Sequence, residues 1–294
     1  MIKPRRLCLI LLLALATFAP FAAQVARADQ AAEADLRSQV YLLWQWINVA
    51  RANPRQVMAR LGIDEQTVRN VLGPDAWILD QGLPPLAWSD QLRAAAQDHD
   101  NEMIARVYYS YLSAQGATPD QRVVASGYQA VASNETLGAL VFQNYLAPAE
   151  ALPVMFDNML RDELTGAPGV ARNIFSTSLT EVGIGITAGS VALLAGQPYV
   201  YLLTLDFAAP ASGRRFVVGL ADPDSQVMVQ NLYTGFWDVA PPLPGGWFQA
   251  RLSGNGEKLY SVGPGEQVRG AASTQGLAVD RNYYFDLRSA SYRP

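Results

Sequence analysis

The chain has 294 residues, of which 22 are Lys or Arg, 26 are Asp or Glu, one is His and one is Cys. Residues 1–28 hold four of the basic side chains and no acidic one, so the other 266 residues have 18 basic and 26 acidic side chains, a formal charge of −8. Because Cys8 lies in that first segment, a disulfide, a thiolate nucleophile and a cysteine zinc site are excluded from the rest. The single histidine, His99, excludes any site that needs two imidazoles. An acidic chain whose one later lysine is Lys258 is also a poor nucleic-acid binder.

The N-terminal segment has the pattern of a secretory signal peptide. Three basic residues precede an apolar run over residues 7–15, and Ala26-Arg27-Ala28 fits a small-x-small cleavage site. The apolar stretch is interrupted by Thr17 and Pro20, and it is short for a membrane span, which needs about 20 apolar residues. We therefore expect cleavage after Ala28, export to the periplasm or the exterior, and no membrane span afterwards. An uncleaved anchor is the alternative.

Helical periodicity dominates the first half of the remaining chain. Apolar residues recur at three- and four-residue steps over residues 36–50, and Asn53-Pro54 ends or kinks that helix. Ser89 is a good N-cap for a helix whose apolar face includes His99. Residues 108–127 have the composition of a long loop, and further helices are expected over about 137–146 and after Pro148.

Alternating periodicity follows, and then a change of character. Residues 182–186 and 199–207 have the apolar alternation of strands. A run of small residues over 208–213 is typical of a linker, and short strands separated by turn residues follow it. The predicted organisation is a signal peptide at 1–28, a mixed α and β domain at 29–208, and a small all-β module of the β-sandwich type at 213–294.

Seven short motifs occur in a defined order between Trp44 and Phe207. They are Ile47-Asn48-Val49-Ala50-Arg51-Ala52, Leu86-Ala87-Trp88 with Leu92, Ala95-Ala96 and His99, Tyr108-Tyr109-Ser110-Tyr111, Gly116 with Arg122 and Gly127-Tyr128, Asn134-Glu135-Thr136-Leu137, Gly169-Val170-Ala171-Arg172-Asn173-Ile174 and Glu181-Val182-Gly183-Ile184-Gly185. In this order the segment resembles the CAP superfamily of cysteine-rich secretory, antigen 5 and pathogenesis-related proteins (SCP-like domains), in its cysteine-free bacterial form. The resemblance implies an α+β fold, a three-layer α-β-α sandwich with an open cleft, here followed by the small all-β module.

Family members with a metal site place two histidines and one or two acids in that cleft. At the matching positions this chain has Tyr111, Val170 and Glu135, and a second acid is not assigned. Zinc prefers nitrogen and sulfur ligands and takes three or four protein groups, so the metal site is degenerate and no metal or other cofactor is expected. The resemblance assigns cleft or ligand-binding positions to Tyr109, Tyr111, Glu135, Val170, Arg172 and Asn173.

Three functions remain open. The leading one is a secreted, non-enzymatic protein that binds a ligand in the cleft, which the resemblance suggests is a lipid or another apolar molecule, or that binds an extracellular protein or glycan. Trp237, Trp247 and Tyr233 are candidates for reading sugars or protein, or for the core of the C-terminal module. The second function is a metal-independent hydrolase with Glu135 as acid or base and a partner such as Asp157 or Glu163. The third is a structural envelope-associated protein without a ligand. His99 fits a packed core position better than a catalytic base.

Overall fold

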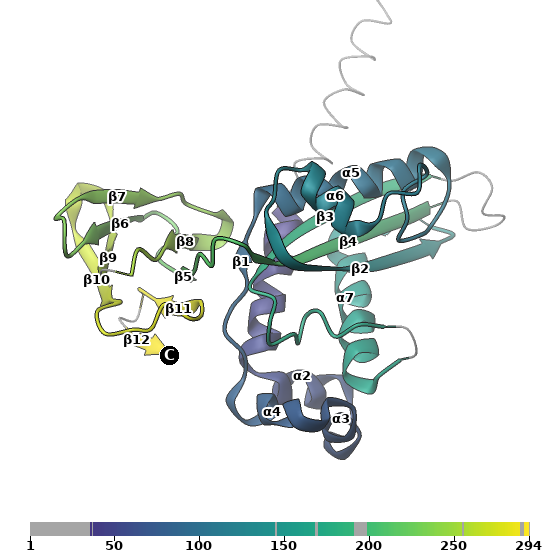
Figure 1. Ribbon diagram of the computed structural model, residues 1–294, viewed down its shortest axis with the longest axis horizontal. Coiled ribbons are helices and arrows are strands. Elements are labelled where there is room, and N and C mark those ends of the chain that lie inside the picture. Colours follow the sequence, from purple (N-terminus) through teal and green to yellow (C-terminus); the bar gives the residue numbers. More distant parts are fainter. Residues whose placement is uncertain are drawn as a thin grey trace, which may run out of the picture.

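The computed structural model describes residues 36, 38–144, 146–167, 170–190, 199–254, 256–288 and 291–293. The expected signal peptide at residues 1–28 lies outside these residues. Figure 1 shows an N-terminal part, in which helices cover a sheet, beside a C-terminal module built of strands. Within the described part of the chain, no helix combines the length and apolarity that a membrane crossing requires.

The helices of the N-terminal part begin at the residues that their caps predict. The Ser89 side chain accepts the Leu92 N–H, as expected, and Asn53 caps the helix that starts at Pro54 by accepting the Gln56 N–H. A helix covers residues 38–52. The other helices are α2 (Pro54–Leu61), α3 (Glu65–Leu72), the 3-10 helix η1 (Gly73–Trp77), α4 (Ile78–Gln81), α5 (Asp90–Arg106), α6 (Pro119–Ala125) and α7 (Pro148–Thr165).

One sheet forms the middle layer of this part. Its strands are β1 (Ala87–Trp88), β2 (Ala130–Phe142), β3 (Glu181–Ser190) and β4 (Tyr199–Pro210), in the order β1-β3-β4-β2. Only the β1–β3 pair is parallel. Alternate residues of β4, including Tyr201 and Phe207, join the core with the 38–52 helix and α7, while Thr204 and Asp206 face α5. The predicted three layers and the α+β fold class are confirmed.

The helix expected over about 137–146 is wrong. Residues 130–142 form β2, which pairs with β4 along its whole length, from Ala130 opposite Pro210 to Phe142 opposite Tyr199. The apolar spacing of a short segment fits helix and strand alike, and the long pairing with β4 decides it. The expected loop at 108–127 also contains α6, which a capping box between Thr118 and Gln121 begins.

The C-terminal module consists of two four-stranded sheets. The strands are β5 (Phe216–Leu220), β6 (Gln226–Asn231), β7 (Trp237–Ala240), β8 (Trp247–Arg251), β9 (Glu257–Val262), β10 (Val268–Ser273), β11 (Tyr283–Asp286) and β12 (Ser291–Arg293), with 3-10 turns η2 (Pro244–Gly246) and η3 (Pro264–Glu266). Their orders are β10-β9-β6-β7 and β12-β11-β5-β8. Val217, Leu259, Phe248 and Phe285 fill the space between the sheets.

The module is attached to the N-terminal part through β8 and through Asn282, which directly precedes β11. Trp247 packs against Trp44 with ring centroids 5.4 Å apart. The Gln249 side chain bonds both backbone groups of Trp88, accepting its N–H at 2.6 Å and donating to its carbonyl at 3.1 Å. The Asn282 amide donates to the carbonyl oxygen of Pro85 at 2.9 Å. These contacts cover the β1 edge of the N-terminal sheet, which would otherwise be an open pairing site.

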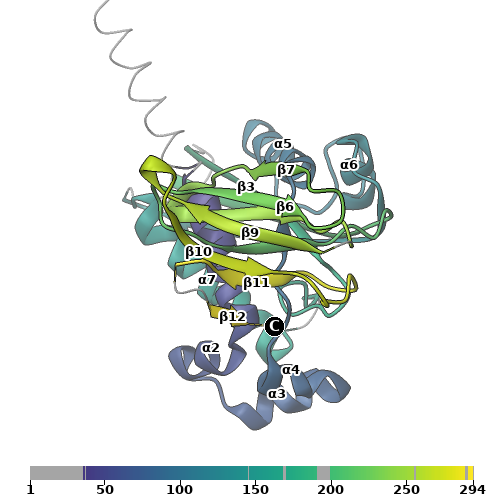
Figure 2. The ribbon, with the colours of Figure 1, turned by 90° about the vertical axis from the view of Figure 1, so that its left-hand side faces the viewer.

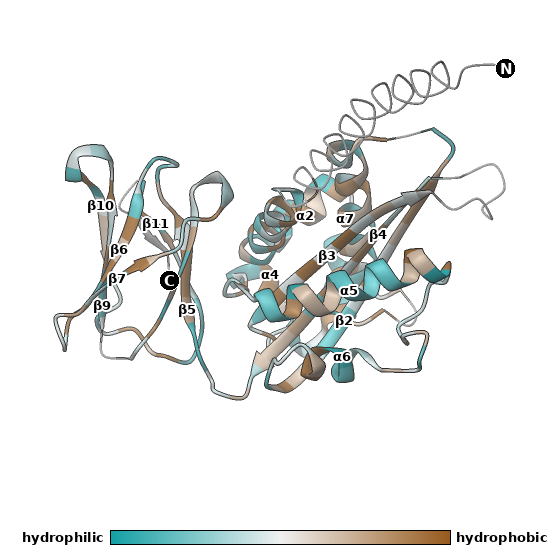
Figure 3. Ribbon diagram, turned by 90° about the horizontal axis from the view of Figure 1, so that it is seen from above, coloured by the Kyte–Doolittle hydropathy of each residue, from teal (hydrophilic) through white to brown (hydrophobic). Residues whose placement is uncertain are grey.

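The sheet β10-β9-β6-β7 is therefore the outer sheet. Figure 3 shows β5 and β11 lying between it and the N-terminal part, and Figure 2 views it from its outer side. In both views its outer face is turned away from the N-terminal helices.

Candidate functional site

Three carboxyl groups, two from strands and one from α5, come together between α5 and the sheet. Glu135 on β2 and Asp206 on β4 are register partners in the antiparallel pair, so their side chains share one face of the sheet. Asp100 descends from α5 onto the same face, where its oxygens accept the Thr204 hydroxyl at 2.5 Å and the Thr204 N–H at 3.2 Å. All three carboxyl groups are buried. We call Asp100, Glu135 and Asp206 the acid cluster.

Arg122 on α6 supplies the positive charge of this region. Its Nη2 lies 2.5 Å from Oε2 of Glu135. Its Nη1 donates to the carbonyl oxygens of Tyr111 at 2.9 Å and Ala117 at 3.0 Å. The guanidinium thus ties the 107–118 loop to the sheet. Burial raises the pKa of Glu135, and the bond from Arg122 opposes that rise.

The carboxyl groups of Glu135 and Asp206 also influence each other's protonation. Among the described residues, Oε1 of Glu135 and both oxygens of Asp206 have no hydrogen-bond donor. Burial, followed by the neighbouring Glu135 charge, raises the pKa of Asp206 well above its usual range. One proton on this pair would give an oxygen of each carboxyl group a partner and leave a single negative charge opposite Arg122.

Neither ring nitrogen of His99 forms a hydrogen bond with the acid cluster. Its Nε2 lies 2.9 Å from the Ser110 carbonyl oxygen, which can only accept, so Nε2 carries the proton. Burial lowers the pKa of His99, and the Arg122 charge acts in the same direction. A neutral, buried imidazole that holds the 107–118 loop matches the packed core position expected from the sequence.

Two of the expected cleft tyrosines lie on that loop. Tyr109 and Tyr111 are about half exposed. Burial raises the pKa of Tyr109 to about 12, and the charges of Tyr111, Asp100 and Glu135 add to the rise. Tyr109 and Tyr111 therefore lie close enough to the acid cluster to sense its charge, while Glu135 itself is 1% exposed at its side chain.

The remaining expected residues, in the 170–173 segment, point in different directions. The Asn173 amide donates to the Glu135 carbonyl oxygen at 3.0 Å and to the Thr136 hydroxyl at 2.9 Å, so it meets Glu135 only through the backbone. Arg172 donates to the Val71 carbonyl oxygen at the end of α3. Val170 is partly exposed.

The expected second acids have other partners. Asp157 on α7 forms an ion pair with Arg60, at 2.6 Å, on the opposite side of the sheet. Glu163 accepts the N–H groups of Ile174 and Phe175, and burial raises its pKa to about 7. The acid that lies beside Glu135 is Asp206, which sequence reasoning missed. The signal was the polar pair Thr204 and Asp206 on alternate positions of an otherwise apolar strand.

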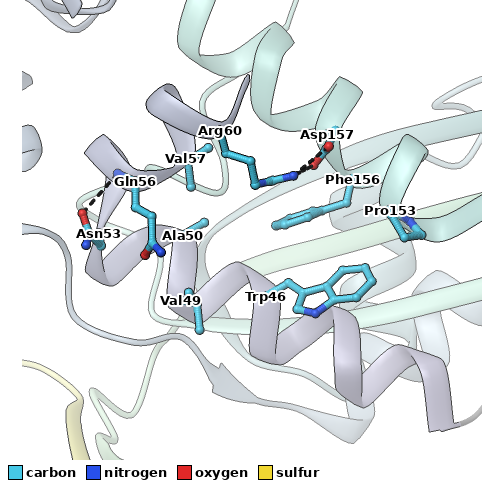
Figure 4. Close-up of a pocket in the computed structure, with 10 residues that line it drawn as sticks. All are labelled: Trp46, Val49, Ala50, Asn53, Gln56, Val57, Arg60, Pro153, Phe156 and Asp157. Carbon is cyan, nitrogen blue, oxygen red and sulfur yellow. Dashed lines mark hydrogen bonds and ion pairs between the residues drawn. The ribbon is translucent and has the colours of Figure 1, made fainter. Parts of the chain in front are cut away.

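A pocket opens on the other face of the sheet, between the 38–52 helix, α2 and α7 (Figure 4). Its volume is about 270 Å³. Trp46 and Phe156 form one wall with ring centroids 5.8 Å apart, and the Arg60–Asp157 ion pair lies at one end. Its lining residues are Trp46, Val49, Ala50, Asn53, Gln56, Val57, Arg60, Pro153, Phe156 and Asp157. We call this site the helix pocket.

No metal centre stands out in the part of the chain that the structure describes. Within it, no three His, Cys, Asp or Glu side chains, those of the acid cluster included, are placed so that they could hold an ion together. The bond from Arg122 occupies Oε2 of Glu135 in the one acid cluster near the expected cleft.

Comparison with known proteins gives one family match. The profile of the CAP, or cysteine-rich secretory protein, family matches residues 45–192. No curated protein matches the chain.

Three solved structures illustrate the similarity. An extracellular protein containing an SCP domain from Bacillus anthracis is 19% identical, with a TM-score of 0.31, over 50% of this chain and 41% of that one. An outer surface protein from Borrelia burgdorferi is 13% identical, with a TM-score of 0.32, over 54% and 96%. A venom allergen-like protein from Schistosoma mansoni is 12% identical, with a TM-score of 0.25, over 49% and 84%. The chain thus spans about two fifths of the first of these structures.

Proposed function

Because the chain belongs to the cysteine-rich secretory protein (CAP) family, whose profile matches half of it, we propose that it is a secreted protein that binds an apolar ligand without transforming it. The observation that carries this proposal is the helix pocket. The signal-like pattern of residues 1–28 and the family's secretory character support the export. We also propose the division into a CAP domain at 29–208 and a β module at 213–294.

The lining of the helix pocket suits one slender apolar molecule. Its walls are mostly aliphatic and aromatic, and its volume of about 270 Å³ is close to the lower limit of roughly 300 Å³ for ligand pockets. Val49 lines the helix pocket and is 54% exposed, so the pocket is open to solvent beside an apolar side chain. Arg60 at one end carries a positive charge that a ligand carboxylate can pair with in competition with Asp157. These features favour a fatty acid or a similar amphiphile.

The hydrolase alternative has weaker support. A general acid or base must come within about 2.6–3.2 Å of the atom it serves. The Glu135 side chain is 1% exposed, and Arg122 occupies one of its oxygens. The acid cluster is better suited to holding the 107–118 loop on the sheet. Turnover on peptide, ester and glycan panels that disappears in Glu135→Gln would favour the hydrolase instead.

The test is a titration with cis-parinaric acid, a fluorescent fatty acid. Val49→Trp fills the helix pocket, and we expect it to weaken binding at least tenfold. Val154→Trp is the matched control, because Val154 is similarly exposed on α7 but does not line the pocket. We expect that variant to bind like the parent chain. Equal binding by Val49→Trp and the parent would refute the site.

A second pair of measurements separates the helix pocket from the expected cleft. Arg60→Gln should weaken binding of a fatty acid more than that of the matching fatty alcohol, which lacks the charge. Tyr111→Ala, in the expected cleft, should leave both affinities unchanged. Loss of binding in Tyr111→Ala, with Val49→Trp unaffected, would instead favour the cleft formed around Tyr109, Tyr111 and Glu135.

A further inference from the structure

The outer face of the sheet β10-β9-β6-β7 carries two rows of side chains that continue across strands. In the first row, Trp237 on β7 is paired with Gln230 on β6, Gln230 with Lys258 on β9, and Lys258 with Ser273 on β10. In the next row, Met228 stands between Val239 and Tyr260. We call the residues of these rows the outer platform.

Aromatic rings on this platform face solvent. Trp237 is 46% exposed, and its ring centroid lies 5.4 Å from that of Tyr260 at an interplanar angle of 32°. At the adjoining β6–β7 turn, Tyr233 and Phe236 are 82% and 70% exposed. Trp247, by contrast, is buried in the contact with the N-terminal part. Exposed aromatic clusters of this kind mark interaction sites.

Polar side chains lie beside the aromatic rings, in the same row as Trp237. Lys258 lies beside the rings with its Nζ 5.2 Å from the Tyr260 centroid, and it forms no ion pair with another described residue. Gln230 adds an amide and Ser273 a hydroxyl in the same row. The platform thus offers an apolar surface, hydrogen-bonding groups and one cation side by side.

The distribution of charge also distinguishes the module. Residues 213–294 hold eight basic and seven acidic side chains, a formal charge of +1, whereas residues 29–212 hold 10 basic and 19 acidic ones, a charge of −9. An anionic polymer is therefore repelled by the N-terminal part and tolerated by the module. Lys258, the one lysine beyond residue 28, provides the complementary charge on the platform.

We propose that the outer platform binds an acidic polysaccharide. The C–H face of a sugar ring stacks on Trp237 and Tyr260, its hydroxyl groups bond to Gln230 and Ser273, and its acidic group pairs with Lys258. A bilayer surface fits less well, because burying Trp237 in it would also take the Gln230 amide and the Ser273 hydroxyl of the same row out of water. This site is independent of the helix pocket.

The proposal is tested by affinity electrophoresis of the full chain in native gels. The gels contain polygalacturonate, alginate or hyaluronate, with neutral dextran as the reference polymer. We expect retardation by at least one acidic polymer and less by dextran. Trp237→Ala should weaken the affinity at least tenfold. Lys258→Gln should weaken it three- to tenfold and flatten its dependence on salt.

Matched controls exclude a general loss of structure or charge. Trp77→Ala removes an exposed tryptophan from η1, and Arg251→Gln removes an exposed cation from β8, the other sheet. Both should bind like the parent chain, as should Val49→Trp, and circular dichroism should confirm that all variants are folded. The proposal is overturned if no acidic polymer retards the chain, or if Trp237→Ala binds like the parent. It is equally overturned if the chain sediments with phosphatidylglycerol vesicles and no acidic polymer retards it.

Discussion

Replacing Asp100 by asparagine should stabilise the protein at neutral pH, although the carboxyl group is buried and fully bonded. Burial raises the pKa of Asp100 from 3.8 to about 7. Between these values the folded chain holds a proton that the unfolded chain has released. The contribution of Asp100 to folding stability is therefore largest below pH 3.8 and falls as the pH rises towards 7.

The size of this effect follows from the pKa. From pH 5 to about 7 the folded state binds about one proton more than the unfolded state, at about 1.4 kcal/mol per pH unit, which gives a loss of about 3 kcal/mol. Asparagine imitates the protonated acid. Its carbonyl oxygen accepts the Thr204 N–H and its amide donates to the Thr204 hydroxyl, so the bonds to Thr204 persist.

The assay is urea unfolding of the parent and Asp100→Asn at pH 5 and pH 8. We expect the variant to lose about 3 kcal/mol less than the parent between the two values. Asp98→Asn, on the exposed side of the same helix, is the control and should behave like the parent. The same pH dependence in Asp100→Asn and the parent, or a variant less stable than the parent at pH 8, would show that the pKa of Asp100 is not raised in the folded state.

Two further changes test the packing and the acid cluster. Trp247→Ala should lower the free energy of unfolding by about 3–5 kcal/mol and expose the 211–215 connection between β4 and β5 to limited proteolysis, because Trp247 packs on Trp44 between the two parts; Trp237→Ala, at an exposed position, should change stability by less than about 1 kcal/mol. Arg122→Ala should cost about 3–5 kcal/mol in thermal or urea unfolding, because it leaves the buried charge of Glu135 unpaired, whereas Arg106→Ala at the exposed end of α5 should cost little. Equal losses in a variant and its control would refute either reasoning.

The sequence predicted elements whose information is local. The period of residues 36–50, the Ser89 cap and the alternation of residues 199–207 each lie within one segment, and each prediction is confirmed. The strand β2 was predicted as a helix because its pairing partner β4 begins at Tyr199, far along the chain. The helix α6 was missed, although Thr118 and Gln121 have the spacing of a capping box.

The site was predictable only in part for the same reason. Glu135 was identified from a motif, but Asp206 becomes its neighbour only through the β2–β4 register. The helix pocket joins Trp46 to Phe156 across two helices that no local pattern connects. The outer platform depends likewise on four strands in register. Sets of side chains from separate strands or helices need the tertiary fold, and residue order alone does not supply it.

The most direct test of ligand binding is a crystal structure of the chain grown with dodecanoate. We expect density for one alkyl chain between Trp46 and Phe156, with its carboxylate beside Arg60. An empty helix pocket at saturating dodecanoate, or an alkyl chain bound beneath Tyr109 and Tyr111 instead, would contradict the account.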